Sequence, residues 1–489
     1  MRSLLIASVL VIGACSQAAR PAAPTPPPRT GFDFVADSLV NRSDLSKAMW
    51  GIEVYDPKAD RVVYSYNGNR HFIPASNTKL IVTTVAMGVL GPGYRYRTPL
   101  LATAREPAVA ALVVIGQGDP TWSERFHGGD FTVLDQLADS VARAGIREID
   151  RLVVDASRFG PERIHYTWEI SDLPGIYAPP VAAIGVAEGT LRLALRGGQR
   201  IGDSATVSIV GPQGVFPLAG RVDTDSAGKG LSLDVDYHNW PDTIRVSGSI
   251  GVNAVDTIRI AQPDAAEFAT AVFAEALRAR GITVRSTQLT YDSAEVARIG
   301  ATAPIATWTS EPLPEIVAAI LKPSQNWIAE QLLRTLGAEK GQAGTWSESL
   351  KVEQAYLVDV IGLDSTDFQL RDGSGMSAQT LMTPRGFVRI LEHTRRQPWA
   401  AVYRNALPAA LEPESTLSSR FQGLENRIFA KTGSITNVST LSGFLVTEDG
   451  RDLTFSILVN ASGRPQAQVR RGMDRLVYQL AGRNNRDVR

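Results

Sequence analysis

Two stretches near opposite ends of the chain have the apolar pattern of helices that pack against a core. Leu80 to Leu90 is an almost continuous apolar run, and Gly91-Pro92 after it is typical of a helix end. From Gln466 to Leu480 the apolar side chains recur at helical spacing, at positions Val469, Met473, Leu476, Val477 and Leu480. We therefore expect a fully buried helix after residue 80 and an amphipathic helix near the C-terminus.

Strand patterns also occur at both ends of the chain. Ala48 to Tyr55 and Arg61 to Tyr66 alternate well enough to predict a hairpin around the turn at residues 56–60. Residues 427–430 predict a short strand, and residues 441–446 and 453–459 predict a second hairpin around Glu448-Asp449-Gly450. We expect these strands, from both ends of the chain, to share one antiparallel sheet with helices covering it.

The middle of the chain has a different character, with many short strands and frequent glycine. Val133 to Ala144 and Ala265 to Arg280 are both amphipathic, and each ends at a Gly-Ile pair before a strand, which indicates one helix–strand unit used twice. Between them, Thr190 to Val252 reads almost entirely as β structure. Helical pattern returns at Leu313, and Lys322-Pro323-Ser324-Gln325 interrupts it because proline breaks a helix.

The first residues have the pattern of an export signal. Residues 1–14 carry one positive charge, at Arg2, followed by an apolar core too short to span a bilayer. Ile12-Gly13-Ala14-Cys15 resembles a bacterial lipobox, so we expect a lipid on Cys15 and an extended proline-rich tether over residues 15–31. Cleavage near Ala18-Ala19, leaving a soluble secreted protein, is the alternative.

Composition narrows the possible functions. Among 489 residues, 50 are Lys or Arg and 50 are Asp or Glu, and no basic run or aromatic-interleaved patch indicates nucleic-acid binding. Cys15 is the only cysteine, which excludes an intrachain disulfide and a thiolate metal site. The five histidines show no metal-ligand spacing, so we expect neither a metal nor a cofactor.

A candidate nucleophile lies at the start of the apolar helix, in Ser76-Asn77-Thr78-Lys79. Residues three apart lie side by side on a helix, so Lys79 can reach the Ser76 hydroxyl and remove its proton if burial disfavours the charged amine. A helix N-cap serine with a solvated lysine is the ordinary structural explanation. Ser226-Ala227-Gly228-Lys229 has the same spacing in a polar loop and is attributed to chance.

Two further motifs follow in the order Ser324-Gln325-Asn326 and Lys431-Thr432-Gly433. Taken alone, the first could be a turn between two helices and the second a polar strand end. Together with Ser76-x-x-Lys79, however, they resemble the penicillin-recognising serine acyltransferases. The 248-residue gap from Ser76 to Ser324 (324 − 76) resembles the long double insertion of the D-alanyl-D-alanine carboxypeptidase/endopeptidase family of low-molecular-mass penicillin-binding proteins. Three other stretches match that family, at residues 116–121, 154–159 and 372–377.

The resemblance implies an α+β fold with a β-lactamase/transpeptidase-like antiparallel sheet, an inserted α/β domain and a small β domain nested inside it. The predicted division is a signal peptide 1–14, a tether 15–31, the transpeptidase-like domain 32–93 and 300–489, the inserted domain 94–189 and 255–299, and the nested β domain 190–254.

The resemblance also implies a reaction and its participants. Ser76 would attack the carbonyl between two D-alanines of a peptidoglycan stem peptide to form an acyl-enzyme, and Lys79 would take its proton. Ser324 would pass a proton to the leaving amine, and Asn326 would hold Lys79 and the substrate amide. β-Lactam antibiotics would act as inhibitors of such an enzyme.

The strand motif would bind the substrate. Lys431 would keep the site cationic and, with Thr432 and Ser434, bind the terminal carboxylate. The backbone N–H groups of Ser76 and Ser434 would form the oxyanion hole, because Gly433 lets the substrate lie against the strand edge.

Two further positions carry weaker expectations. Asp155 follows a predicted buried strand, and the resemblance implies that it faces the cleft, although a cap at a strand end explains it as well. Ala378 stands where relatives usually carry an arginine that can pair with an acidic stem residue. Two alternatives to the peptidase remain open, a lactamase or esterase on the same fold and a catalytically silent envelope-binding protein.

Overall fold

The computed structural model describes residues 30–236 and 243–483, so the predicted signal peptide and Cys15 lie outside the described residues. One five-stranded sheet combines strands from both ends of the chain, in the order β16-β17-β18-β1-β2, and all neighbouring pairs are antiparallel. Its strands are β1 (Met49–Asp56), β2 (Arg61–Tyr66), β16 (Ile428–Ile435), β17 (Val438–Val446) and β18 (Asp452–Asn460). The predicted hairpins and the shared antiparallel sheet are therefore confirmed.

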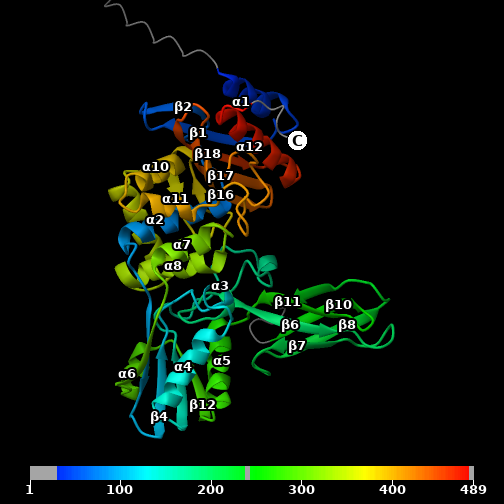
Figure 1. The fold of residues 1–489 in the computed structure, drawn as a ribbon, viewed down its shortest axis with the longest axis vertical. Coiled ribbons are helices and arrows are strands. Elements are labelled where there is room, and N and C mark those ends of the chain that lie inside the picture. The colour runs from blue at the N-terminus through cyan, green and yellow to red at the C-terminus, as the bar shows by residue number, and fades with distance from the viewer. Residues whose placement is uncertain (1–29, 237–242, 484–489) are drawn as a thin grey trace, which may run out of the picture.

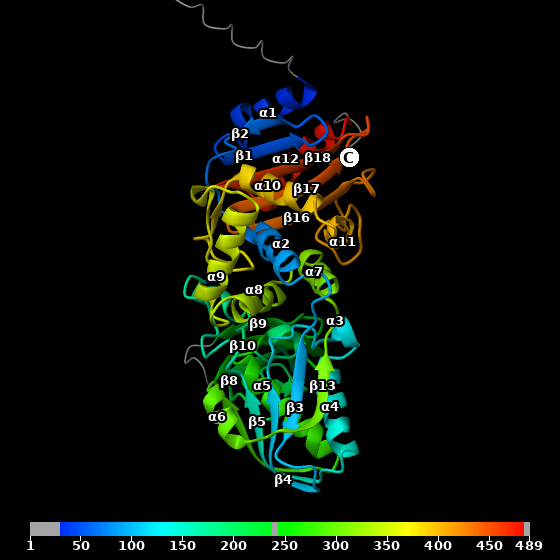
Figure 2. The same ribbon diagram turned by 90° about the vertical axis from the view of Figure 1, so that its left-hand side faces the viewer.

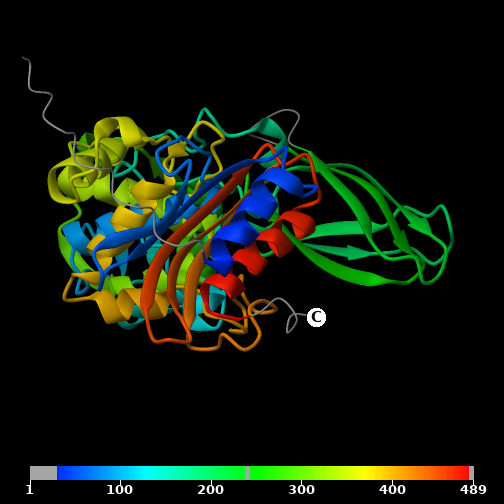
Figure 3. The same cartoon turned by 90° about the horizontal axis from the view of Figure 1, so that it is seen from above.

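Helices cover both faces of this sheet. α1 (Gly31–Arg42) and α12 (Gln466–Leu480) lie side by side across one face (Figure 3), where Phe32, Trp50 and Met473 contribute to a shared core. α10 (Pro384–Arg395) packs on β1 and β18. α12 was predicted, whereas α1 was not. The N-terminal signal of α1 is a capping box in which Thr30 and Asp33 satisfy each other's backbone groups.

A layer of helices separates this sheet from the rest of the molecule (Figure 2). The predicted apolar helix is α2, whose first nine residues are buried, and it packs against α7, α8 and α10. The break predicted at Pro323 separates α7 from α8. The bounds in this layer are α2 (Lys79–Val89), α7 (Leu313–Leu321), α8 (Asn326–Lys340), α9 (Trp346–Ala355) and α11 (Ala400–Ala406).

A second five-stranded sheet, in the order β12-β5-β4-β3-β13, lies beyond the helix layer. β12, β5 and β4 are mutually parallel, while β3 and β13 are antiparallel to their neighbours. The strands are β3 (Arg97–Ala102), β4 (Ala108–Ile115), β5 (Glu148–Asp155), β12 (Thr283–Thr290) and β13 (Ala303–Thr309). The helices are α3 (Glu124–His127), α4 (Thr132–Arg143), α5 (Ala265–Ala279) and α6 (Ser293–Ile299). α4 and α5 are the repeated helices expected from the pattern.

Two three-stranded sheets, β11-β6-β7 and β8-β10-β9, project to one side (Figure 1). Their strands are β6 (Thr190–Arg196), β7 (Thr206–Val210), β8 (Leu218–Asp225), β9 (Ser232–Asp236), β10 (Ile244–Gly251) and β11 (Val255–Ala261). β11 follows the boundary predicted at residue 254 but pairs with β6, and β13 follows the boundary at residue 299 but pairs with β3. Periodicity alone does not reveal which sheet a short strand joins, since pairing decides it.

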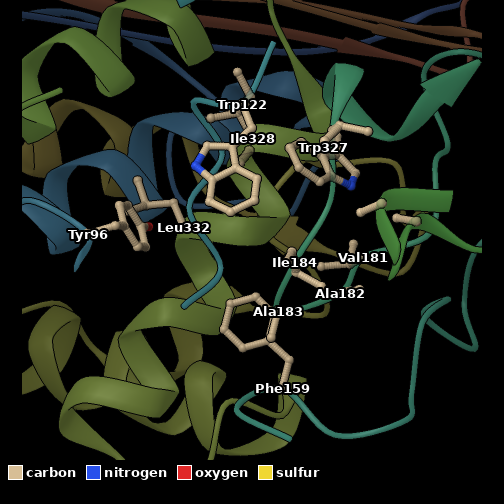
Figure 4. Packing of buried hydrophobic residues seen from close by; sticks show 14 of the residues in the cluster. Tyr96, Trp122, Phe159, Val181, Ala182, Ala183, Ile184, Trp327, Ile328 and Leu332 are labelled. Atoms are coloured by element: carbon tan, nitrogen blue, oxygen red, sulfur yellow. The ribbon is translucent and has the colours of Figure 1, made fainter. Parts of the chain in front are cut away.

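One apolar core continues from α2 and α8 into the second five-stranded sheet and the two three-stranded sheets. Figure 4 shows Trp327, Ile328 and Leu332 of α8 beside the segment Val181 to Ile184. The indole of Trp327 donates a hydrogen bond to the Pro180 carbonyl, 3.0 Å away. α8 therefore carries the second predicted motif at its N-terminus and also joins the sheet-bearing parts of the chain.

Candidate active site

Ser76 and Lys79 lie where a 3-10 helix, η1 (Ala75–Thr78), runs into α2. The tighter 3-10 turn, rather than the expected α-helical turn, carries Ser76, and Ala75 before it has a positive φ of 46°. A non-glycine residue at such a φ is strained and persists only where the surroundings hold it. Lys79 Nζ lies 2.9 Å from Ser76 Oγ.

Two more oxygen atoms surround the Lys79 amine. Asn326 Oδ1 and the carbonyl oxygen of Ser374 each lie 2.6 Å from Nζ. Burial lowers the pKa of Lys79 from its usual value to about 7, and the nearby carboxyls of Asp372 and Glu330 oppose this shift. A lysine with a pKa near neutrality can act as a general base.

Ser324 and Lys431 form a second hydrogen-bonded pair. Lys431 Nζ donates to Ser324 Oγ, 2.8 Å away, and to the Thr432 carbonyl, 2.7 Å away. Burial, with the nearby Lys79, lowers the pKa of Lys431 well below its usual value. Ser324 has a positive φ of 68°, which gives the turn between α7 and α8 an unusual backbone conformation.

The second motif is anchored by its middle residue. Gln325 caps α8, because its Oε1 accepts from Trp327 N at 2.7 Å. Its Nε2 donates to Glu188 Oε2, at 2.6 Å, and Asn326 Nδ2 donates to the Tyr177 carbonyl, at 2.7 Å. These bonds tie the turn that carries Ser324 to the inserted part of the chain.

β16 runs directly beside the nucleophile. A Cβ atom on Gly433 would lie 2.2 Å from Thr440 Oγ1, 2.8 Å from the Pro74 carbonyl oxygen and 2.9 Å from Ser76 N. Glycine is therefore required for this close approach. Gly433 was expected to let the substrate lie against β16. Its missing side chain also lets η1 lie against the same strand.

A cavity of about 390 Å³ opens between these elements. Ser76, Ser324, Thr432, Gly433 and Ser434 line it, together with Ser415, Thr416, Ser418, Arg420, Ser439, Thr440, Arg470 and Met473. Hydroxyl groups and two guanidinium groups dominate this lining. The cavity thus offers hydrogen-bond donors suited to a carboxylate beside the nucleophile.

Asp155 lies apart from this group. It is buried at the end of β5, and its Oδ1 accepts from Ser157 N at 2.8 Å, which is the strand-end cap described above as the ordinary explanation. Within the described part of the chain, this side-chain hydrogen bond reaches none of the three motifs, and Asp155 does not line the 390 Å³ cavity. Its role in binding stays a prediction.

Sequence reasoning did not identify Ser374 or Glu330 as parts of the site. The stretch 372–377 was noted for its resemblance, yet Asp372-Gly373-Ser374 reads as a turn, and a backbone carbonyl that binds a lysine leaves no signature. Glu330 could have been found, because it lies four residues after Asn326 and hence on the same face of α8. Ala378, where relatives usually carry an arginine, is exposed.

A family model described as the D-Ala-D-Ala carboxypeptidase 3 (S13) family matches residues 34–480. The chain belongs to this family. Members of the family are hydrolases, and the chain is accordingly a D-Ala-D-Ala carboxypeptidase. A D-alanyl-D-alanine carboxypeptidase from Actinomadura sp. (strain R39) is 31% identical over 453 residues, which cover 88% of this chain and 81% of the relative.

Solved structures agree with this assignment at the level of the fold. Penicillin binding protein 4 (dacB) from Haemophilus influenzae matches with a TM-score of 0.78 at 22% identity, over 91% of this chain and 99% of the other. The same protein complexed with a β-lactam matches with a TM-score of 0.73 at 20% identity, over 93% and 99%. The S13 chain is thus an α+β protein with the predicted antiparallel sheet.

Proposed function

We propose that this S13 chain hydrolyses the D-Ala-D-Ala bond of peptidoglycan stem peptides, as a carboxypeptidase and D,D-endopeptidase, through an acyl-enzyme on Ser76. The observation that carries the proposal is the 2.9 Å contact between Ser76 Oγ and Lys79 Nζ, an amine whose pKa burial lowers to about 7. Ser76 Oγ forms the bond to the substrate carbonyl carbon while its proton moves to the Lys79 lone pair.

Collapse of the tetrahedral intermediate breaks the bond to the leaving D-alanine nitrogen. Ser324 relays a proton to that nitrogen: its hydroxyl hydrogen moves to the nitrogen, and the proton that Lys79 took from Ser76 restores the hydroxyl. Because Ser324 Oγ accepts a hydrogen bond from Lys431 Nζ, its own hydrogen remains free to point at the leaving group. Water then hydrolyses the acyl-enzyme.

The substrate lies along β16. The backbone N–H groups of Ser76 and Ser434 bind the developing oxyanion, and the side chains of Thr432, Ser434 and Lys431 bind the terminal carboxylate. The cavity lining of hydroxyl and guanidinium groups supports this placement. A carboxylate bound there favours the charged form of Lys431, against the effect of burial.

Acylation by a fluorescent penicillin, followed by a chase, tests the proposal. A long-lived label that depends on Ser76, and is absent in Ser76→Ala, is expected of the peptidase. Rapid turnover of the label indicates a lactamase or esterase, and no label in the folded wild-type protein indicates a silent binding protein. The β-lactam complex of the Haemophilus influenzae protein supports penicillin as the probe.

We also propose three structural units for the chain, with boundaries moved to follow strand pairing. Residues 32–93 and 310–483 form the transpeptidase-like unit, residues 94–189 and 262–309 the inserted α/β unit, and residues 190–236 and 243–261 the nested β unit. The membership of β11 and β13 in their sheets supports these limits.

The chain is proposed to be exported and held at the cell envelope by a lipid on Cys15. Within residues 30–236 and 243–483, no helix is long and apolar enough to cross a membrane. Expression of wild type and Cys15→Ala in a bacterial host, with labelled palmitate and separation of membranes, tests the anchor. Label and membrane association that persist in Cys15→Ala would exclude lipidation at this cysteine.

A further inference from the structure

The loop 372–377, whose Ser374 carbonyl binds Lys79, is built around two fully buried carboxyl groups. Glu330 Oε1 accepts from Gly373 N, at 3.0 Å, and from Ser374 N, at 2.7 Å, while its Oε2 accepts from Trp346 Nε1, at 2.8 Å. Asp372 accepts from Gly375 N, at 3.2 Å, and Ser377 N, at 2.8 Å. Buried carboxyl groups this well supplied with donors fix the backbone around them.

The same loop is wedged between the two elements that carry the catalytic groups. A Cβ on Gly373 would lie 2.9 Å from Leu333 Cβ of α8. A Cβ on Gly375, whose φ is +80°, would lie 1.9 Å from the Ala75 carbonyl oxygen, next to the nucleophile. The loop therefore contacts α8 on one side and η1 on the other, and a shift of either anchor would move the Ser374 carbonyl.

The Ser374 carbonyl determines how the hydrogens of the neutral Lys79 amine are arranged. A neutral amine has two N–H hydrogens and one lone pair, and Nζ has three oxygen neighbours. Asn326 Oδ1 and the Ser374 carbonyl can only accept hydrogens. Once both are occupied, the lone pair is left for the third neighbour, the Ser76 hydroxyl, which must then donate.

We propose that Glu330 and Asp372 are positioning residues for acylation. They hold the Ser374 carbonyl so that it and Asn326 bind both hydrogens of the neutral Lys79 amine and turn its lone pair to Ser76. The N–H of Gly375 and the carbonyl of Ser374 belong to one peptide group, so the bond from Gly375 N to Asp372 also strengthens that carbonyl as an acceptor. The inference rests on the proposed role of Lys79 as base.

The negative charges of Glu330 and Asp372 also favour acylation. Burial lowers the pKa of Lys79 and the charges of Asp372 and Glu330 raise it, so they stabilise the ammonium that forms when Ser76 loses its proton. Burial and Asp372 raise the pKa of Glu330 to about 7, and its three N–H donors oppose this. The charged or titratable groups that face Lys79 and Glu330 are Asp372, Lys431, Glu353 and Arg334.

The test compares two substitutions of Glu330 with one of a neighbouring buried carboxyl. Glu330→Ala removes the anchor and the charge, whereas Glu330→Gln keeps a carbonyl oxygen for the two loop N–H groups but removes the charge and the acceptor for Trp346 Nε1. Glu353→Gln is the matched control, because Glu353 is also buried but, among the described residues, makes no hydrogen bond to the loop, and burial raises its pKa. Acylation by fluorescent penicillin is measured across neutral pH, with the melting temperature of each variant.

In Glu330→Ala we expect the second-order acylation rate constant to fall roughly a hundredfold, as for a base moved out of line. In Glu330→Gln we expect a smaller loss, with the acid limb of the pH–rate profile moved to lower pH because a charge that favours the ammonium is gone. Glu353→Gln should match wild type in rate and profile.

The outcomes separate this inference from the proposed function. Failure of the wild-type protein to label at Ser76 would remove the catalytic proposal itself. If wild type labels but folded Glu330→Ala acylates at the wild-type rate, Glu330 has no positioning role. Should Glu330→Ala not fold, Glu330→Gln decides, since it lacks both the charge and an acceptor for Trp346 Nε1; an unchanged rate with an unmoved acid limb would then overturn the proposed role.

Discussion

Two buried lysines stand within one site, and their surroundings assign them different tasks. Both have lowered pKa values, since both are fully buried. Lys79 faces the Ser76 hydroxyl and two fixed acceptors, whereas Lys431 faces the Ser324 hydroxyl and its own strand. The contacts therefore support a base at position 79 and a donor to Ser324 at position 431.

Arginine substitutions separate these tasks, because arginine keeps a positive charge but does not release its proton near neutral pH. Lys79→Arg should abolish acylation by fluorescent penicillin. Lys431→Arg should retain a measurable rate, since a guanidinium can still donate to Ser324. Both variants are first shown to be folded by circular dichroism. Complete loss in both folded variants would contradict this division of labour.

The acylation rate should also depend on pH in a defined direction. Only the neutral form of Lys79 can accept the Ser76 proton, and its pKa lies at about 7. Raising the pH through this value removes the ammonium proton, so the second-order rate constant with penicillin should rise across neutrality and then level off. A rate that stays flat or falls over this interval would exclude Lys79 as the titrating base.

At the scale of elements, the site depends on how closely η1 and β16 approach. Thr440 Oγ1 donates to the Pro74 carbonyl at 2.9 Å, so β17 also holds the residue two before the nucleophile. In the β16–β17 register Gly433 lies opposite Thr440, which places the only glycine of β16 at the point of contact.

Gly433→Ala should force the strand and η1 apart, because its Cβ would overlap Thr440 Oγ1 and crowd Ser76 N. We expect acylation to slow roughly a hundredfold, as a displacement of about 1 Å can do. Gly230→Ala is the control, since a Cβ there meets nothing within 4 Å. Acylation rates of the two variants are compared with wild type, and an unimpaired Gly433→Ala enzyme would show that the close approach is dispensable.

At the scale of the whole molecule, a buried arginine joins α8 to the inserted part. Arg334 is fully buried and donates to the backbone carbonyls of Phe159, Glu162 and Gly344. Its guanidinium also lies over the ring of Trp346, 4.4 Å from the centroid. Burial lowers its pKa to about 10, so it remains charged at neutral pH.

Arg334→Leu should destabilise the protein strongly, because it leaves three backbone carbonyls without this donor. A buried unsatisfied acceptor costs about 1–3 kcal/mol, so we expect the free energy of unfolding to fall by at least about 3 kcal/mol. Denaturant unfolding measures the loss. Arg280→Ala, which removes a surface arginine paired with Asp135 and Asp139, should cost less than about 1 kcal/mol. Similar losses in both would mean that Arg334 does not join the two parts.

The sequence by itself was sufficient for features that depend on local pattern. The apolar run of α2, the amphipathic faces of α4, α5 and α12, and both hairpins of the first sheet follow from periodicity and turn residues. The order of three short motifs was sufficient for the family, because each motif combines a chemical group with a local backbone form. The helix α1 was missed although its capping residues are local, since a short amphipathic segment before a strand has a weak pattern.

Tertiary structure alone decided which distant groups meet. Residues 79, 326 and 374 are far apart in the chain, and only the packing of α2, α8 and the loop 372–377 brings the oxygen atoms of Asn326 and Ser374 to the Lys79 amine. The same holds for β11 and β13, because strand pairing is set by neighbours in space. The pKa of Lys79 was likewise beyond the sequence, since it depends on complete burial and on two carboxyl groups 251 and 293 residues away (330 − 79 and 372 − 79). Local composition can encode a helix or a turn, but desolvation and charge act through distances that only the folded chain defines.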